Sequence, residues 1–116
     1  MFIGLLLSFG LVAFQGKPTN TSYEYMQINV LESVVKGGVG RSRMIVTDTQ
    51  GNSPEPINLD NYYSLTGMNF SNIQSNEKAI VVQLNLLGKE GWEVVGTTSG
   101  GNEVYFTKYT LRRPLR

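Results

Sequence analysis

The side chains that most often carry out chemistry in proteins are scarce in this 116-residue sequence, which contains no histidine and no cysteine. Thiol nucleophiles, imidazole bases and the usual zinc sites each require one of those residues, so these sites are excluded. A disulfide framework is excluded for the same reason. We therefore expect no metal site and no cofactor. The carboxylates show no paired spacing, and we expect them to be scattered over the surface: Asp48, Asp60, Glu90, Glu93 and Glu103.

Two serines are each followed three residues later by a lysine, Ser33 by Lys36 and Ser75 by Lys78. Serine acyl-transfer enzymes use this spacing at the start of a helix, but they need further motifs and a much longer chain. A serine at a helix start also accepts a hydrogen bond from a free backbone N–H, and this capping role accounts for Ser75. We therefore predict no catalytic residue and expect the protein not to be an enzyme.

A glycine cluster, residues 37–40, stands immediately before Arg41 and Arg43. Glycines beside arginines are typical of a loop that cradles phosphate, but the glycine-rich phosphate loops join a strand to a helix. Here the alternation of apolar residues on both sides of the cluster predicts two strands, residues 23–32 and 41–48. We therefore interpret the cluster as the turn of a hairpin and keep the phosphate loop as the alternative.

A tyrosine-lined sheet face is the one feature of the sequence that favours a function. In the strand of residues 23–32 the apolar side chains at even positions point one way, and the tyrosines point the other way. In the last strand, residues 103–111, we expect Val104 and Phe106 to face the core and the tyrosines to face away. With an arginine from the second strand, the predicted binding residues are Tyr23, Tyr25, Arg43, Tyr105 and Tyr109.

Tyrosine combines apolar area with a hydroxyl group and is enriched at protein interfaces. We infer a non-enzymatic binding or self-association module, with a protein partner or a second copy of the chain on this face. Residues 59–73 leave two alternatives open, since their apolar side chains would either cover the tyrosines or enclose a pocket with a carboxylate and a tyrosine. Such a pocket is typical of a small envelope enzyme or ligand-binding protein. Ten basic and nine acidic residues give a net charge of +1, which disfavours nucleic acid as the partner.

Residues 79–87 have the spacing of an amphipathic helix. We expect Ser75 or Asn76 to cap its start, Gly88 to end it, and Gly91 to supply a left-handed turn after it. The apolar stripe of this helix must be buried: Ala79, Ile80, Val82, Leu84, Leu86 and Leu87.

Two further strands follow the helix. Trp92 is large enough to fill the gap between helix and sheet, and it opens a strand that runs to about Thr98. Residues 99–102 predict a hairpin turn into the last strand, which leads into a basic tail of Arg112, Arg113 and Arg116. We interpret this tail as solvated protection of the sheet edge and keep binding of an acidic partner as the alternative. The pattern predicts an α+β fold, in which one long helix packs on one face of an antiparallel sheet of about four strands in the order β-β-α-β-β.

Residues 84–95 read Leu-Asn-Leu-Leu-Gly-Lys-Glu-Gly-Trp-Glu-Val-Val. This block resembles the helix-to-strand signature of a family of small bacterial domains, domain of unknown function 4177. Members of that family open with a Tyr-Glu-Tyr strand, and residues 23–25 here are Tyr-Glu-Tyr. Residues 32–71 are extra material that departs from the family outline. The resemblance implies the fold described above and no particular activity, because the family has none assigned.

Residues 2–14 are almost entirely apolar. A membrane-spanning helix needs about 20 such residues, so this stretch is too short to span and fits the core of a secretory signal peptide. We predict a signal peptide over 1–16, a linker over 17–22 and a single domain over 23–116. This predicts a periplasmic or secreted protein without stable membrane insertion after removal of the signal. The alternative is an apolar helix that packs on the domain or anchors it to a membrane, and the lack of cysteine excludes a lipoprotein.

Overall fold

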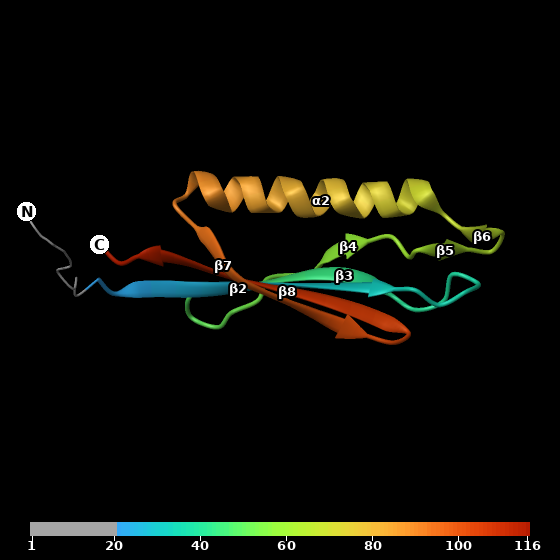
Figure 1. Cartoon of the computed structure of the whole chain (residues 1–116), viewed down its shortest axis with the longest axis horizontal. Coiled ribbons are helices and arrows are strands. Elements are labelled where there is room, and N and C mark those ends of the chain that lie inside the picture. Colours follow the sequence, from blue (N-terminus) through green and yellow to red (C-terminus); the bar gives the residue numbers. More distant parts are fainter. Residues whose placement is uncertain (1–20) are drawn as a thin grey trace, which may run out of the picture.

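One antiparallel sheet and one long helix dominate residues 21–116, the part of the chain that the computed structural model describes (Figure 1). The sheet has five strands in the spatial order β4-β3-β2-β8-β7. The predicted signal peptide, residues 1–16, and most of the predicted linker lie outside the described residues. The strands of this sheet are β2 (Tyr23–Ser33), β3 (Ser42–Thr47), β4 (Ile57–Leu59), β7 (Glu93–Gly101) and β8 (Val104–Pro114).

The central strand is β2, which pairs with β3 on one side and along its whole length with β8 on the other. The α+β fold, with one helix and an antiparallel sheet, is confirmed, and all four predicted strands are present. The sheet has a fifth strand that the sequence did not predict, β4, placed between β3 and the helix in the chain. Its three residues follow Pro54 and Pro56, which favour a loop and obscure so short a strand.

A small second sheet lies between β4 and the helix, formed by β5 (Tyr63–Ser64) and β6 (Gly67–Met68). Leu65 at its tip is 92% exposed, so this side chain neither covers the tyrosines nor encloses a pocket. The start of the segment is held against the end of β2, where the Tyr62 N–H donates to the Ser33 carbonyl at 3.0 Å.

The helix, α2 (Phe70–Lys89), begins more than one turn before the predicted start. Asn69 caps it, because its side-chain oxygen accepts a hydrogen bond from the Asn72 N–H at 3.0 Å. Gly88 lies inside the last turn and does not end the helix. The left-handed residue is Gly91, with a φ of 94°, as predicted.

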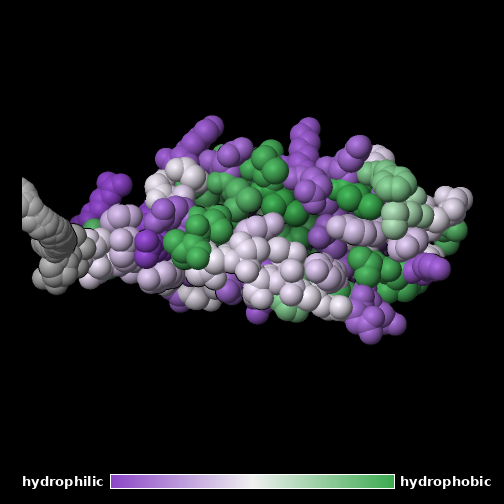
Figure 2. All heavy atoms as spheres, viewed as in Figure 1, coloured by the Kyte–Doolittle hydropathy of each residue, from purple (hydrophilic) through white to green (hydrophobic). Residues whose placement is uncertain are grey.

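One face of α2 packs on the sheet, and Trp92 is buried immediately after its last turn. Val82 and Leu86 are about half exposed, so the buried stripe is narrower than predicted. Figure 2 shows the hydrophobic surface that remains exposed on α2 and over the start of β7. In residues 21–116 no helix is long and apolar enough to span a membrane. The core consists of Met26, Ile28, Val30, Met44, Ile80, Leu87, Trp92 and Leu111.

Candidate functional site

The sheet face turned away from α2 carries no helix or second sheet within the described part of the chain (Figure 1). Directly opposed residues of an antiparallel pair point to the same side, so the register defines which side chains lie there. We call this surface the open face. Its residues are Tyr23, Tyr25, Gln27, Asn29 and Leu31 of β2, Arg43, Ile45 and Thr47 of β3, Phe106, Lys108, Thr110, Arg112 and Pro114 of β8, and Glu93, Gly96, Thr98 and Gly100 of β7.

The structure separates the five predicted binding residues. Tyr23, Tyr25 and Arg43 lie on the open face, whereas Tyr105 and Tyr109 lie on the α2 side, opposite Glu32 and Ile28 of β2. The prediction for these two tyrosines is therefore wrong.

The physical reason is the burial of Leu111 at the other end of β8. Leu111 has the same parity as both tyrosines and is only 1% exposed in the core, so burial of Leu111 turns Tyr105 and Tyr109 toward α2. Burial, and then the charges of Glu77 and Glu32, raise the pKa of the Tyr109 hydroxyl. The parity of Leu111 was the sequence signal that would have placed both residues correctly.

Two side chains that the sequence assigned elsewhere, Arg112 and Phe106, lie on the open face instead. The Arg112 guanidinium, predicted to be part of a solvated tail, lies 4.0 Å from the centre of the Tyr23 ring. Its Nε donates to Glu93 Oε1 at 3.0 Å, and this hydrogen bond raises the pKa of Arg112 above its ordinary value. Lys108 lies 5.8 Å from the centre of the Phe106 ring, which the sequence had placed in the core. Cation and aromatic side chains are thus paired across this surface.

A shallow hollow of about 340 Å³ lies on the open face beside Tyr25. Gln27 and Thr110 form its floor together with the tyrosine, and the loop after β3 forms its rim. That loop is shaped by Asp48, whose Oδ1 accepts hydrogen bonds from the N–H groups of Gln50 at 2.9 Å and Asn52 at 2.8 Å. The hollow therefore offers an aromatic ring, an amide and a hydroxyl on a fixed frame.

The open face carries an excess of positive charge. Its strand residues include three cations, Arg43, Lys108 and Arg112, and one carboxylate, Glu93, which is already paired with Arg112. Near the centre of the face, the Oδ1 atom of Asn29 is buried without a hydrogen-bond partner among the described residues. A buried acceptor without a donor is unfavourable, so this position is not optimised for stability of the free protein.

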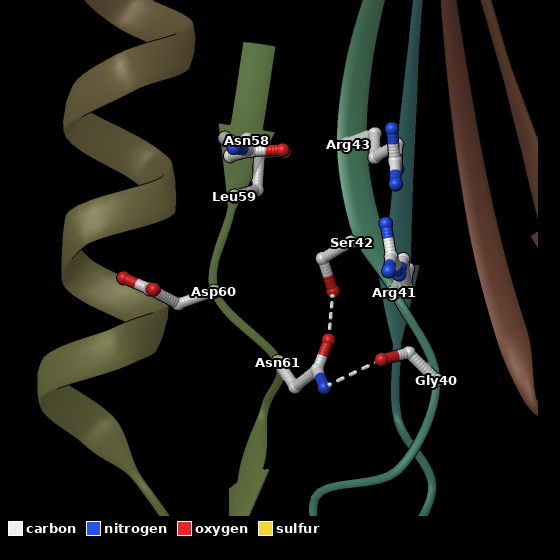
Figure 3. Close-up of a pocket in the computed structure, with 8 residues that line it drawn as sticks. All are labelled: Gly40, Arg41, Ser42, Arg43, Asn58, Leu59, Asp60 and Asn61. Carbon is white, nitrogen blue, oxygen red and sulfur yellow. Dashed lines mark hydrogen bonds between the residues drawn. The ribbon is translucent and has the colours of Figure 1, made fainter. Parts of the chain in front are cut away.

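A second hollow, of about 310 Å³, lies where β3 approaches residues 58–61 (Figure 3). Asn61 fixes its base: the side-chain Nδ2 donates to the carbonyls of Gly38 and Gly40, both at 3.0 Å. The Asn61 Oδ1 accepts from the Ser42 hydroxyl at 2.7 Å. Arg41 and Arg43 stand on the β3 side of this hollow, which we call the arginine hollow (Figure 3).

A buried acid lies beneath the start of the segment 59–73, as the pocket alternative required. Glu32 is 5% exposed and accepts a hydrogen bond from Asn76 Nδ2 at 3.0 Å. Burial raises its pKa, although hydrogen bonds from Asn76 and Tyr62 act in the opposite direction. Neither Glu32 nor Tyr62 lines the arginine hollow, so this carboxylate and tyrosine hold the segment in place and do not face a cavity there.

Comparisons of this chain with protein-family models, with curated proteins and with solved structures found no match. The resemblance of residues 84–95 to the family of unknown function therefore stays a prediction. Within residues 21–116 no group of three or more acidic side chains is placed to hold a metal ion.

Proposed function

We propose that this protein is a non-enzymatic binding module that docks an acidic protein surface on its open face. The observation that carries the proposal is a wide sheet face on which no other layer packs within residues 21–116, and on which cations are paired with aromatic rings. Exposed tyrosine and arginine are the residue types that dominate binding energy at protein interfaces. Tyr25 is 51% exposed beside the 340 Å³ hollow and is the natural anchor for a partner side chain.

The charge of the open face favours a different protein over a second copy as the partner. Three cations against one engaged carboxylate would repel the same face of a second chain in a two-fold dimer. An acidic partner, in contrast, would pair with Lys108 and Arg43, which make no ion pair within residues 21–116. Such charges raise the association rate and select the partner.

The chemistry of the chain supports a binding role over an enzymatic one. The sequence has no histidine or cysteine, and the buried Glu32 is engaged by Asn76. A general acid or base must reach the substrate, and Glu32 does not line the arginine hollow. We also propose the predicted periplasmic or secreted location. An exported module without catalytic groups would act by binding.

The test is affinity capture from an extract of the native organism, with single variants of the open face. We expect an acidic protein that the wild type retains and that both Tyr25→Ser and Lys108→Glu lose. Lys78→Glu, on the exposed side of α2, reverses the same charge and is the matched control. Capture should also weaken as salt is raised from about 0.05 M to 0.5 M, because exposed charges are screened.

Two outcomes would overturn the proposal. If Lys108→Glu and Lys78→Glu reduce capture equally, the open face is not the surface that recognises the partner. Sedimentation velocity of the purified domain should show a monomer, and a dimer that Tyr25→Ser dissociates would replace the acidic partner with self-association.

A further inference from the structure

We propose that the arginine hollow binds a dianionic phosphate group, through the side chains of Arg41 and Arg43. Arg43 is the second residue of β3, and Arg41 lies immediately before the strand begins. Both line the hollow, and Figure 3 shows their guanidinium groups one after the other along its β3 wall. This site is separate from the hollow beside Tyr25, but it shares Arg43 with the open face.

The two guanidinium groups have no counter-charge in the described part of the protein. The ion pairs formed by arginine within residues 21–116 use Arg112 and Arg113, with Glu93 and Glu24 as partners. Two adjacent cations without a carboxylate repel each other, and an anion that bridges them removes this repulsion.

The one acid in the lining, Asp60, is not positioned to be that counter-charge. Figure 3 shows its carboxylate directed away from both arginines and toward α2. The backbone of Asp60 is fixed from both sides by Asn76, whose Oδ1 accepts from the N–H at 2.8 Å and whose Nδ2 donates to the carbonyl at 2.7 Å. The Asp60 backbone is therefore held in place by Asn76, and its carboxylate does not neutralise the two arginines.

Two other polar side chains of the hollow, Ser42 and Asn61, are already engaged, which leaves the arginines as its charged donors. Asn61 and Ser42 are joined to each other, and Asn61 also bonds the carbonyls of the glycine turn. Gly40 must stay small, since its φ is 94° and a Cβ there would lie 2.8 Å from the Ser33 hydroxyl. The glycine cluster thus shapes the turn that carries Arg41, and no backbone phosphate loop is needed.

The dimensions and chemistry select the ligand class. A volume of about 310 Å³ is at the lower end for small-molecule sites, so a phosphate monoester or free phosphate fits and a dinucleotide does not. The planar fork of arginine matches phosphate and carboxylate oxygens, and two forks balance a dianion better than a monoanion. We therefore expect phosphate and sulfate to bind and acetate to bind at least about fivefold more weakly.

The test is a titration of the ¹⁵N-labelled protein with inorganic phosphate at pH 7.5, at constant ionic strength adjusted with sodium chloride. Saturable shifts should be confined to the amides of residues 40–43 and 58–61. Arg41→Gln and Arg43→Gln should each weaken binding about tenfold, as expected when one charged hydrogen-bond partner is removed. Arg116→Gln, an exposed arginine outside both hollows, is the matched control.

Unsaturable shifts, or equal phosphate affinity in wild type and Arg41→Gln, would overturn this proposal. Equal affinities for acetate and phosphate would assign the site to carboxylates instead. Arg41 precedes β3 and is not one of the open-face strand residues, whereas Arg43 belongs to both sites. Arg41→Gln should therefore leave capture of the acidic partner unchanged, and Lys108→Glu should leave the phosphate affinity unchanged. A failure of the phosphate site and a failure of the protein-binding face are therefore distinguishable.

Discussion

Replacement of Asn76 by alanine should destabilise the protein more than any other polar-to-alanine change on α2. Asn76 is 1% exposed and makes three hydrogen bonds, two with the backbone of Asp60 and one with the Glu32 carboxylate. A neutral hydrogen bond contributes about 1 kcal/mol and one to a charged group about 1.5 to 3 kcal/mol. Their loss amounts to about 4 kcal/mol, which the better helix propensity of alanine reduces by about 0.5 kcal/mol.

That loss is a large fraction of the total for a domain of this size, about 5 to 14 kcal/mol on the usual per-residue scale. Urea unfolding measures it, with the fluorescence of Trp92 as the probe, because this is the only tryptophan and it is buried. Asn85→Ala is the matched control, an exposed asparagine on the same helix with the same gain in propensity. Because both variants gain the same helix propensity, we expect them to differ by about 4 kcal/mol at unchanged denaturant slope.

A difference below about 1 kcal/mol would refute the assignment of a buried polar network, since a single buried hydrogen bond already contributes that much. The same pair of variants links stability to the arginine hollow. Asn76 holds both backbone groups of Asp60, so Asn76→Ala should also weaken phosphate binding, whereas Asn85→Ala should not.

Three further changes test individual features. Burial raises the pKa of Glu32, so the free energy of unfolding should fall as pH rises from the ordinary value of 4.5 through the raised one. Glu32→Gln should remove this pH dependence of the free energy of unfolding and should be more stable than the wild type at pH 7. Urea titrations at several pH values measure both effects, and an unchanged pH dependence would contradict the raised pKa of Glu32. Asn29→Val removes an unpaired buried oxygen from a strand and should raise the free energy of unfolding by about 1 kcal/mol, and a decrease would mean that the oxygen has a partner. Gly101→Ala should lower the melting temperature and reduce the free energy of unfolding by about 2 kcal/mol or more, because φ is 134° and a Cβ would overlap the Val104 carbonyl. Gly100→Ala is the control and should have little effect, since the nearest side-chain atom to its Cβ would lie at 3.5 Å. Equal effects of the two substitutions would contradict this prediction.

The sequence predicted the elements of the fold well because local patterns determine them. The alternation along β2 and the helical spacing of Ile80, Leu84 and Leu87 each identify one element without any tertiary information. β4 was missed because three residues are too few for an alternation to be visible. The hairpin turn after β7 was placed too early, since β7 continues to Gly101.

The errors at the candidate site have a common cause in contacts between distant residues. Asn76 resembled a helix cap, but it is an interior residue whose partner Glu32 is 44 positions away in the chain. The face of β8 was assigned from Phe106 and Val104, although Leu111 at the other end decides it. Both faces of β8 carry aromatic side chains, so its amphipathic pattern is ambiguous until the register with β2 is known.

The adjacent residues Arg112 and Arg113 show how the sheet divides stability from recognition. Arg113 points to the α2 side, where its Nε donates to Glu24 at 2.7 Å, its Nη1 donates to the Glu90 carbonyl at 2.8 Å, and its guanidinium lies 4.5 Å from the Trp92 ring. That arginine joins the end of α2 to β2 and β8.

Arg112 points to the open face, where it contacts Tyr23 and the exposed Glu93. The same division holds for other charges: Glu24 and Glu32 on the α2 side have internal partners, whereas Lys108, Arg41 and Arg43 have none within residues 21–116. Charges with internal partners stabilise the fold, while cations without them gain most from an external anion. The distribution of satisfied and unsatisfied charge is therefore itself the reason to assign the open face and the arginine hollow to recognition.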